Sequence, residues 1–539
     1  MKATHANRPR LVVLCAAVAA LTLIAAAAAG AAPRGDNGPP LRPAAVVNIT
    51  GGVARGSVVD GGYAFLGLPY AAPPVGELRW REPQPPASWH GIRDATQYAA
   101  SCPQPPSPFA GPGPFSEDCL YLNVATPTLQ PKAARPVLVW IHGGGFTQDA
   151  SRNYDGTALA AQGVVVVTIN YRLGALGFLA HPALASSPGG PSGNYGLMDQ
   201  QAALQWVQQN IDRFGGDPGN VTIAGQSAGG VSVLAHMVSQ GSRGLFERAI
   251  VQSGAFALNQ VPLANAEAFG EQFAAQVGCA TDTAQCLRSV PVDTLVNDFP
   301  GAAIPGVVDG KVLTEPLGSA LAAGRFARVP VINGINHDEE LIFVAGLQLA
   351  VSGGTFVPVP QPVNDSTYES VIASVLGVSA ARATAIAAEY PPAAYGSALG
   401  ALTFLVSDAN FACPALQVDQ WTSAHVPTFA YQFDDDSAPQ RFAPPDSGLP
   451  AIATHSSEIQ YLFDQPNTPV QATLDATQQQ LANTMRNAWA TFAADGSPSS
   501  NAVPWPSFDT ASQVVSLASP TPQIDSTFAA QHHCDFWAG

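Results

Sequence analysis

The chain has 539 residues, of which 47% are hydrophobic and 12% are charged, and its formal net charge is −16 at pH 7. This apolar content can build a large core and excludes an intrinsically disordered protein. The acidic balance argues against nucleic acid and anionic lipid as partners, because like charges repel. Length alone suggests two to four domains, although large α/β enzymes exceed that expectation.

Residues 1–32 have the pattern of an export signal peptide. Lys2, Arg8 and Arg10 precede a mostly apolar, alanine-rich stretch at 11–29, and small residues follow to Ala32. A stretch of this length could instead form a single membrane anchor. We expect cleavage near residues 29–32, since the stretch is only mildly hydrophobic and small residues suit a signal peptidase. The prediction is a secreted, extracellular protein that has no stable membrane span once the signal is removed.

Six cysteines remain beyond the signal, and an even number in an exported chain indicates disulfides. They are Cys102, Cys119, Cys279, Cys286, Cys413 and Cys534. Six cysteines permit 15 pairings. Proximity in the sequence favours Cys102–Cys119 and Cys279–Cys286, which leaves Cys413–Cys534. Metal ligation is the alternative, but no C-x-x-C or paired His/Cys spacing supports it, so no metal is expected.

The early part of the mature chain predicts irregular structure and hairpins. Residues 33–45 are expected to be a disordered lead-in. Residues 46–68 alternate apolar and polar side chains around glycine pairs, which is typical of β-hairpins. Between Cys102 and Cys119 the density of proline predicts an irregular surface flap without a helix.

From residue 136 the pattern changes to that of a doubly wound α/β sheet. Continuous apolar runs at 136–141 and 164–169 predict parallel strands that are covered on both faces. Further strands are expected at 221–223, 248–252, 329–335 and 427–433, and helices at 200–211, 265–277, 368–390 and 477–492. Large apolar residues recur on one face of the last helix, which indicates core packing and no cofactor. Residues 46–539 contain no internal repeat or long linker, so we expect a single domain there.

The segment Gly225-Gln226-Ser227-Ala228-Gly229 has the G-x-S-x-G pattern between an apolar strand and a helix. In that setting the serine lies on a tight, strained turn that exposes its hydroxyl, and the glycines avoid collisions with neighbouring backbone. The backbone N–H of Ala228, at the start of the helix, points to where an oxyanion would form. Ser227 is therefore the candidate nucleophile.

A glycine-rich turn follows the strand at 136–141 and reads His142-Gly143-Gly144-Gly145-Phe146. Consecutive glycines leave backbone N–H groups open to a reacting carbonyl. In α/β-hydrolases such a turn after an early strand supplies the other half of the oxyanion hole.

A serine hydroxyl also needs a base and a group that orients the base. His455 lies in a loop late in the chain, which fits the order Ser, acid, His. The position of His455 in the sequence is equally compatible with a surface histidine that has no catalytic role. The acid is expected after the strand at 329–335, where Asp338, Glu339 and Glu340 are consecutive. The pattern does not choose among these three, and a solvated acidic loop is the simpler explanation of such a run.

The chain is similar to the type-B carboxylesterase family, which includes the cholinesterases, from about residue 65 to 537. The resemblance rests on several ordered motifs in addition to the serine elbow and the glycine turn. These motifs are FLGLPY at 65–70, SEDCLYLN at 116–123, NYR at 170–172, GNYGLMDQ at 193–200, QSG at 252–254 and CDFW at 534–537.

The resemblance implies an α/β-hydrolase fold and specific roles. It selects Glu339 as the acid and His455 as the base, and it implies that Gly144, Gly145 and Ala228 form the oxyanion hole. It agrees with the three disulfide pairings. It also implies two buried ion pairs that hold loops, Arg79–Glu117 and Arg172–Asp199, and a supporting position for Ser253 near the acid.

The sequence departs from the family pattern in three features. Gln226 stands where the cholinesterases have glutamate. The flap contains Phe109 and Phe115 but no tryptophan that could receive a quaternary ammonium group. Both features count against choline esters. Glu340 replaces the usual glycine after the acid.

The sequence therefore predicts a secreted serine esterase that hydrolyses small carboxylic esters through a Ser-Glu-His triad and an acyl-enzyme, without a cofactor. A lipase is one alternative, although the short flap has no evident amphipathic lid helix. A non-catalytic, cholinesterase-like binding protein is the other, and the filled triad positions argue against it.

Overall fold

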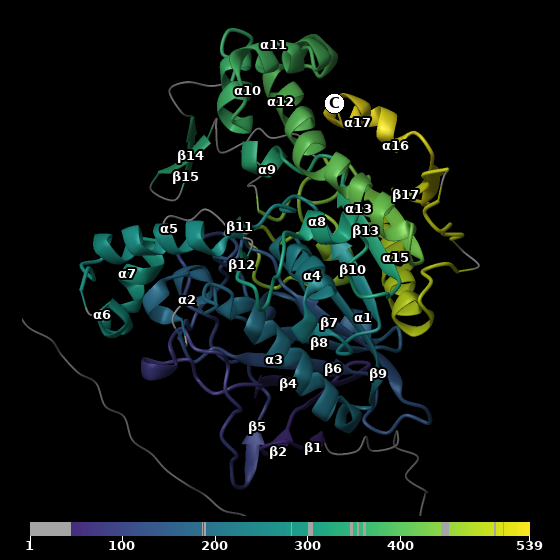
Figure 1. Ribbon diagram of the computed structural model, residues 1–539. Coiled ribbons are helices and arrows are strands. Elements are labelled where there is room, and N and C mark those ends of the chain that lie inside the picture. The colour runs from purple at the N-terminus through teal and green to yellow at the C-terminus, as the bar shows by residue number, and fades with distance from the viewer. Residues whose placement is uncertain are drawn as a thin grey trace, which may run out of the picture. The chain divides into compact units, whose positions relative to one another are not determined.

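An 11-stranded sheet is the centre of the computed structural model (Figure 1), with the order β18-β17-β16-β13-β10-β9-β7-β8-β6-β4-β3. Neighbouring strands from β17 to β8 are parallel, and antiparallel strands lie at both ends. The strands are β3 (Ser57–Val59), β4 (Gly62–Pro69), β6 (Tyr121–Thr126), β7 (Arg135–Ile141), β8 (Val165–Ile169), β9 (Gly216–Gln226), β10 (Arg248–Gln252), β13 (Val331–Asn336), β16 (Thr428–Phe433), β17 (Val514–Leu517) and β18 (Gln523–Asp525). The mostly parallel sheet predicted from the apolar runs is confirmed.

The structure describes residues 45–442 and 452–538, apart from short gaps at 186, 188–189, 282, 300–305, 345–348, 353–354, 359–362, 501–502 and 510. The described residues belong to the unit Ala44–Gly539. The expected signal at 1–32 and nearly all of the expected lead-in at 33–45 lie outside the described residues.

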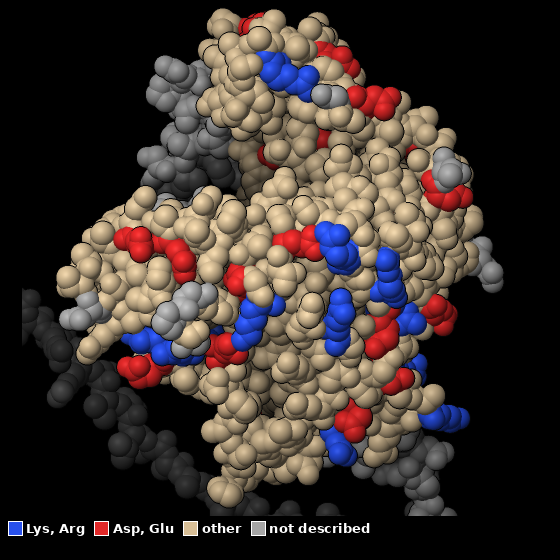
Figure 2. Space-filling model, in the orientation of Figure 1, with Lys and Arg blue, Asp and Glu red and all other residues tan. Residues whose placement is uncertain are grey.

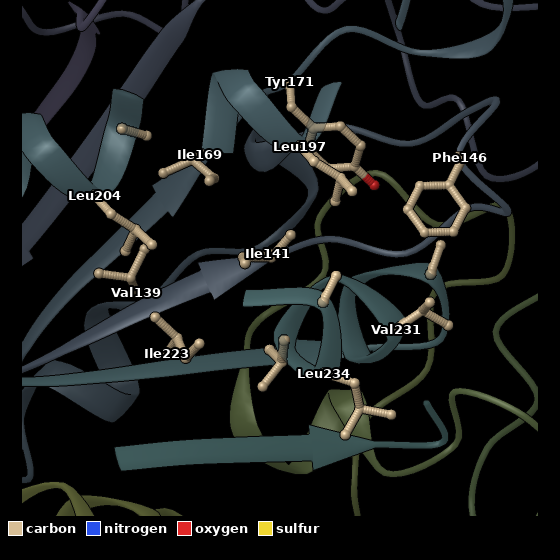
Figure 3. Close-up of a cluster of buried hydrophobic side chains, with 14 of the residues drawn as sticks. Val139, Ile141, Phe146, Ile169, Tyr171, Leu197, Leu204, Ile223, Val231 and Leu234 are labelled. Carbon is tan, nitrogen blue, oxygen red and sulfur yellow. The ribbon is translucent and has the colours of Figure 1, made fainter. Parts of the chain in front are cut away.

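Helices cover both faces of the sheet. Alternate side chains of a strand point to opposite faces, so a strand that is apolar throughout needs helices on both sides. From β7, Val139 and Ile141 pack in one cluster with α3 (Tyr195–Asn210) and α4 (Ala228–Val238). Figure 3 shows this cluster, in which side chains of the strands meet Leu197, Leu204, Val231 and Leu234. From the same strand, Leu138 and Trp140 join a second cluster, which contains α15 (Ala476–Asp495). Strands buried on both faces explain the continuous apolar runs of the sequence.

Among the predicted helices, the one expected at 368–390 differs most from the structure. The predicted helix at 368–390 is two helices, α10 (Tyr368–Leu376) and α11 (Ala380–Glu389), because Gly377 ends the first in the left-handed conformation with φ of 63°. The helices not yet named are α1 (Thr157–Ala160), α2 (Gly174–Phe178), α5 (Leu263–Gln276), α6 (Thr283–Ser289), α7 (Val292–Asn297), α8 (Leu317–Ala322), α9 (Leu341–Val344), α12 (Ala398–Ser407), α13 (Cys413–Ser423), α14 (Ile459–Leu462), α16 (Phe528–Gln531) and α17 (Cys534–Ala538).

Small sheets accompany the large one. The hairpin predicted near Gly51 is β1–β2, which pairs further with β5, and the hairpin predicted near Gly61 is β3–β4. Two further strand pairs, β11–β12 and β14–β15, lie outside these sheets. The strands of the small sheets are β1 (Val46–Ile49), β2 (Gly52–Arg55), β5 (Ile92–Asp94), β11 (Val261–Pro262), β12 (Val307–Val308), β14 (Leu349–Ser352) and β15 (Thr355–Pro358).

One helical run in the described chain, Ala398–Ser423, is long and apolar enough to cross a membrane. It consists of α12, α13 and a π-helical turn between them, Asp408–Ala412. Of its most apolar window 67% is buried inside the protein, as is common for a core helix. The bent pair formed by α10 and α11 passes the same test only when the two helices are counted as one span.

Three disulfides are present, and their pairings confirm those expected: Cys102–Cys119, Cys279–Cys286 and Cys413–Cys534. The first closes the proline-rich flap, in which the structure contains no helix or extended strand, as predicted. Figure 2 shows that acidic and basic side chains are interleaved on the face in view.

Candidate active site

The elbow around Ser227 joins β9 to α4. Ser227 has φ of 57° and ψ of −124°, a conformation that L-residues rarely adopt, and its N–H donates to Gln252 O at 2.8 Å. A Cβ atom added to Gly225 would lie 2.5 Å from the Gly229 backbone, and one added to Gly229 would overlap Ile141 O. Both glycines are therefore required by close backbone contacts, as the sequence predicts.

The three predicted oxyanion donors lie around this elbow. Gly144 and Gly145 follow β7 with positive φ angles of 87° and 60°, and both line the same cavity as Ser227. Ala228 is the first residue of α4. Within the described chain, none of these three backbone N–H groups donates a hydrogen bond. All three are thus available to a ligand oxygen.

The structure brings His455 into contact with Glu339. His455 Nδ1 forms a short hydrogen bond with Glu339 Oε2, and the His455 backbone N–H donates to Glu339 O at 3.3 Å. A backbone bridge between Asp338 and Thr454 aligns the two loops. Glu339 is fully buried, and its Oε1 accepts from the Asn336 N–H at 2.8 Å. The carboxylate is therefore fixed from both sides.

The neighbouring acids make other contacts. Asp338 lies 3.2 Å from His337 Nδ1, and Glu340 Oε1 accepts from Asn410 Nδ2 at 3.0 Å. Of the three consecutive acids, Glu339 is the one that bonds to His455. This is the residue that the family resemblance selected.

The charge of His455 depends on burial and on Glu339. Burial disfavours the imidazolium, but the Coulomb attraction and hydrogen bond of Glu339, together with the charges of Glu458 and Glu340, outweigh burial and raise the pKa of His455. Behind this pair, burial and the negative charge of Glu339 raise the pKa of Glu458 to about 7, although a hydrogen bond from Asn336 opposes the shift. The site is thus a buried group of coupled ionisable residues.

The other ring nitrogen of His455 contacts Gln226. Because Nδ1–H donates to Glu339, Nε2 is the acceptor, and Gln226 Nε2–H donates to it at 3.1 Å. In the described chain no hydrogen bond joins Ser227 Oγ to His455. Ser227 and His455 are 8% and 6% exposed, and both line the cavity.

This cavity has a volume of about 480 Å³ and mostly apolar walls. Five phenylalanines contribute to the walls together with the glycine turn, the elbow and the His455 loop. They are Phe109, Phe256, Phe343, Phe411 and Phe442. An apolar cavity that contains a serine, an imidazole and free N–H donors can hold the acyl and alcohol parts of an ester.

Supporting residues lie where the resemblance implies. Arg79 and Arg172 form bidentate ion pairs with Glu117 and Asp199, and each N···O distance is 2.7 Å. Ser253 Oγ accepts from Asn336 Nδ2 at 3.3 Å, which places the serine next to the residue that holds Glu339.

Three residues that make contacts in the site were not predicted from the sequence. Gln226 was noted only as a departure from a family pattern, and neither Asn336 nor Glu458 was given a role. The signal in the sequence was that each of them lies within three positions of Ser227, Glu339 or His455. In the described part of the chain, no group of three or more His, Cys, Asp or Glu residues could hold a metal ion.

A parallel α/β sheet with a serine elbow and a glycine turn at neighbouring strand ends defines the α/β-hydrolase class. Residues 43–537 match the Carboxylesterase family, to which the chain belongs. The protein is therefore a carboxylic ester hydrolase.

Relatives support this assignment. The chain is 35% identical to a pyrethroid hydrolase, Ces2e, of Rattus norvegicus, over 89% of this chain and 87% of the relative. It is 34% identical to the para-nitrobenzyl esterase of Bacillus subtilis, over 86% and 92%. The solved structure of a thermophilic PNB esterase superposes with a TM-score of 0.74 at 32% identity, covering 89% of this chain and 97% of that chain.

Proposed function

We propose that this hydrolase cleaves small carboxylic esters with Ser227 as nucleophile, His455 as base and Glu339 as the orienting acid. The observation that carries the proposal is the position of His455. One ring nitrogen bonds to the buried Glu339, and the imidazole lines the cavity that contains Ser227. Glu339 holds the tautomer in which Nε2 can accept a proton.

In the first step, Ser227 Oγ attacks the acyl carbon and His455 Nε2 accepts the hydroxyl proton. Nε2 must first exchange its hydrogen bond with Gln226 for one with Ser227, and Gln226 immediately precedes the serine. The negative oxygen of the tetrahedral intermediate accepts hydrogen bonds from the N–H groups of Gly144, Gly145 and Ala228. Each such donor contributes about 3–4 kcal/mol in other hydrolases.

In the second step, the imidazolium of His455 gives its proton to the alcohol oxygen as the ester C–O bond breaks. The acyl group is then bound to Ser227. Water attacks this acyl-enzyme while His455 accepts one of its protons, and the carboxylic acid leaves as the proton returns to Ser227 Oγ. No cofactor is needed for this sequence.

We further propose that the chain is exported, that it is cleaved near residues 29–32, and that residues 46–539 form one catalytic domain. Three disulfides are consistent with an oxidising, extracellular compartment. The test is the mass of the protein recovered from the culture medium of an expressing cell. A full-length chain retained in the cytoplasm would contradict export.

The mechanism is tested by replacing Ser227 with alanine. We expect kcat for 4-nitrophenyl butyrate to fall by about 10⁶-fold, as in other triad enzymes. A fluorophosphonate should modify the wild-type peptide that contains Ser227 and leave the variant unlabelled. Replacement of Ser370, an exposed serine on α10, is the matched control. Turnover near the wild-type rate in Ser227→Ala would contradict the mechanism.

The same assay decides between a soluble-ester esterase and a lipase. Aryl esters of increasing acyl length are compared below and above their solubility limits. We expect no increase in rate when the substrate forms an interface. A sharp increase at that point would favour the lipase.

A further inference from the structure

One carboxylate in the cavity wall has an oxygen without a donor. Glu340 lines the cavity and is 8% exposed. Its Oε1 accepts from Asn410 Nδ2 at 3.0 Å, and its backbone N–H donates to Ser407 Oγ at 3.0 Å. No described residue donates a hydrogen bond to Oε2. The side chain is therefore held in position with half of its hydrogen-bonding capacity unused.

The cationic group that acts on Glu340 is His455, through a Coulomb attraction without a hydrogen bond in the described chain. No lysine or arginine lines the cavity, and no ion pair of Glu340 is present in the described chain. Burial raises the pKa of Glu340, because a charged carboxylate loses hydration there. A buried carboxylate with one hydrogen-bond donor and no ion pair is unfavourable, and a cationic ligand would offset that cost.

The second acid in the wall, Asp149, is in a different situation. Asp149 accepts hydrogen bonds from the Ala150 N–H at 2.7 Å, Asn153 Nδ2 at 2.7 Å and the Tyr154 hydroxyl at 2.5 Å. These donors use both of its oxygens. The protein thus satisfies Asp149 itself and leaves Glu340 able to accept from a ligand.

Aromatic rings line the same cavity as Glu340. Phe343 and Phe411 line the same cavity, and their ring centroids lie 5.1 Å and 5.4 Å from the ring of His455. The faces of such rings attract cations. A further acceptor, Gln465 Oε1, is buried in the wall and has no donor in the described chain. The cavity therefore contains hydrogen-bond acceptors and aromatic rings, and both are suited to a cationic group that can donate hydrogen bonds.

We propose that Glu340 makes this esterase select esters that carry a protonated amine, bound between the free carboxylate oxygen and the rings of Phe343 and Phe411. The inference rests on the proposed function, since it names the substrate class of the same site. A protonated primary or secondary amine can donate N–H···O bonds to the carboxylate, which are stronger than neutral hydrogen bonds. A quaternary ammonium group cannot donate them, which is consistent with the features that count against choline esters.

The test compares esters that differ only in charge. For the acyl side, the pair is the 4-nitrophenyl esters of 6-aminohexanoic acid and heptanoic acid. For the alcohol side, it is the benzoate esters of 5-aminopentanol and hexanol. In each pair a protonated amine replaces a methyl group of similar size. The measured quantity is the ratio of kcat/KM for the cationic ester to that for the neutral ester.

We expect this ratio to fall about tenfold or more in Glu340→Gln for at least one pair, as expected for loss of a charge-assisted hydrogen bond. Gln retains an acceptor for Asn410, and Glu340→Asp should keep part of the preference. Glu271→Gln, which removes an exposed charge on α5, is the control and should keep the wild-type ratio. Because the ratio compares two substrates on one enzyme, a change in the pKa of His455 cancels.

A ratio within twofold of wild type for both pairs would overturn the proposal. If Glu340→Gln does not fold, inhibition of the wild-type enzyme is measured instead. Pentylammonium should inhibit hydrolysis of a neutral ester at a lower concentration than hexanol, and equal inhibition would overturn the proposal.

These results are separate from the test of the mechanism. Turnover of neutral esters that depends on Ser227, without a preference for amines, would refute only the role of Glu340.

Discussion

Two adjacent glutamates face different partners in this site, and the difference can be measured. Glu339 bonds to His455, whereas Glu340 bonds to Asn410. In Glu339→Gln the amide can no longer stabilise the imidazolium, and we expect kcat for a neutral ester to fall by about 10⁴-fold, as in other triads that lose their acid. Glu340→Gln should lose far less. A larger loss in Glu340→Gln than in Glu339→Gln would contradict the assignment of the acid.

Gln226 contacts the ring nitrogen of His455 that we propose as the base. Its amide lies 3.1 Å from His455 Nε2, so Gln226→Glu would put a negative charge beside a ring whose pKa Glu339 already raises. The added charge should raise that pKa by one unit or more. Because the base must be neutral to accept a proton, the acid limb of the pH profile of kcat/KM should move to higher pH by about that amount.

The uncharged variant Gln226→Leu is the control for this shift. It also removes the amide but adds no charge, so its acid limb should stay close to that of the wild type. An acid limb that does not move in Gln226→Glu would show that His455 is not the group that titrates in the free enzyme.

The individual site residues were only partly predictable from the sequence. Ser227 was evident because a tight turn needs glycine on both sides of it, and that need is local. The partner of His455 was not evident from residue patterns, because three acids in a row differ only in where the backbone directs them. A bridge between Asp338 and Thr454 sets that direction, and it joins loops that are more than one hundred residues apart. The resemblance to a family supplied what the local pattern could not.

At the level of elements, helix α15 packs against one face of the sheet. Leu481, Met485, Trp489 and Phe492 are fully buried on it, and the Trp489 indole N–H donates to Gln252 Oε1 at 2.9 Å. Gln252 in turn donates to Glu458 at 3.1 Å, so the helix packs against buried residues behind the proposed triad. The apolar stripe is core, as its helical spacing predicts.

Leu481→Ala should lower the free energy of unfolding by about 2–5 kcal/mol, because it removes buried methyl groups and leaves a cavity. The measurement is the urea midpoint followed by tryptophan fluorescence, with the slope checked for two-state behaviour. Gln480→Ala, at an exposed position of the same helix, is the control and should change the midpoint little. Equal midpoints for the two variants would contradict the packing argument.

Element boundaries were harder to predict than element types. The helix expected at 368–390 breaks at Gly377, because glycine adopts a left-handed conformation easily and Ser379 then caps a new helix by accepting from the Arg382 N–H at 3.3 Å. The strand β6 was not predicted. Its polar Asn123 is buried and bonds to Ser151 and Thr168, which a pattern of apolar residues cannot reveal.

At the scale of the whole molecule, the C-terminal segment is tied to the turn between α12 and α13. The disulfide Cys413–Cys534 joins residues 121 positions apart. Next to it, His532 Nδ1 lies 2.5 Å from Asp408 Oδ1, and its Nε2 lies 2.6 Å from Gln432 Oε1. The same turn carries Asn410 and Phe411, which line the cavity. The attachment of the C-terminus therefore supports one wall of the active site.

Removing this disulfide should destabilise the protein more than removing a short one. In the chain-entropy model, a loop of 121 residues contributes about 5 kcal/mol and the seven-residue loop of Cys279–Cys286 about 2 kcal/mol. We therefore expect the double variant Cys413→Ser, Cys534→Ser to unfold at a lower urea concentration than the control Cys279→Ser, Cys286→Ser. It should also raise KM, since the freed turn carries cavity residues. If the two double variants unfold at the same midpoint, the long loop does not constrain the unfolded chain. The link between the C-terminus and the active site would then depend on the buried contacts of His532.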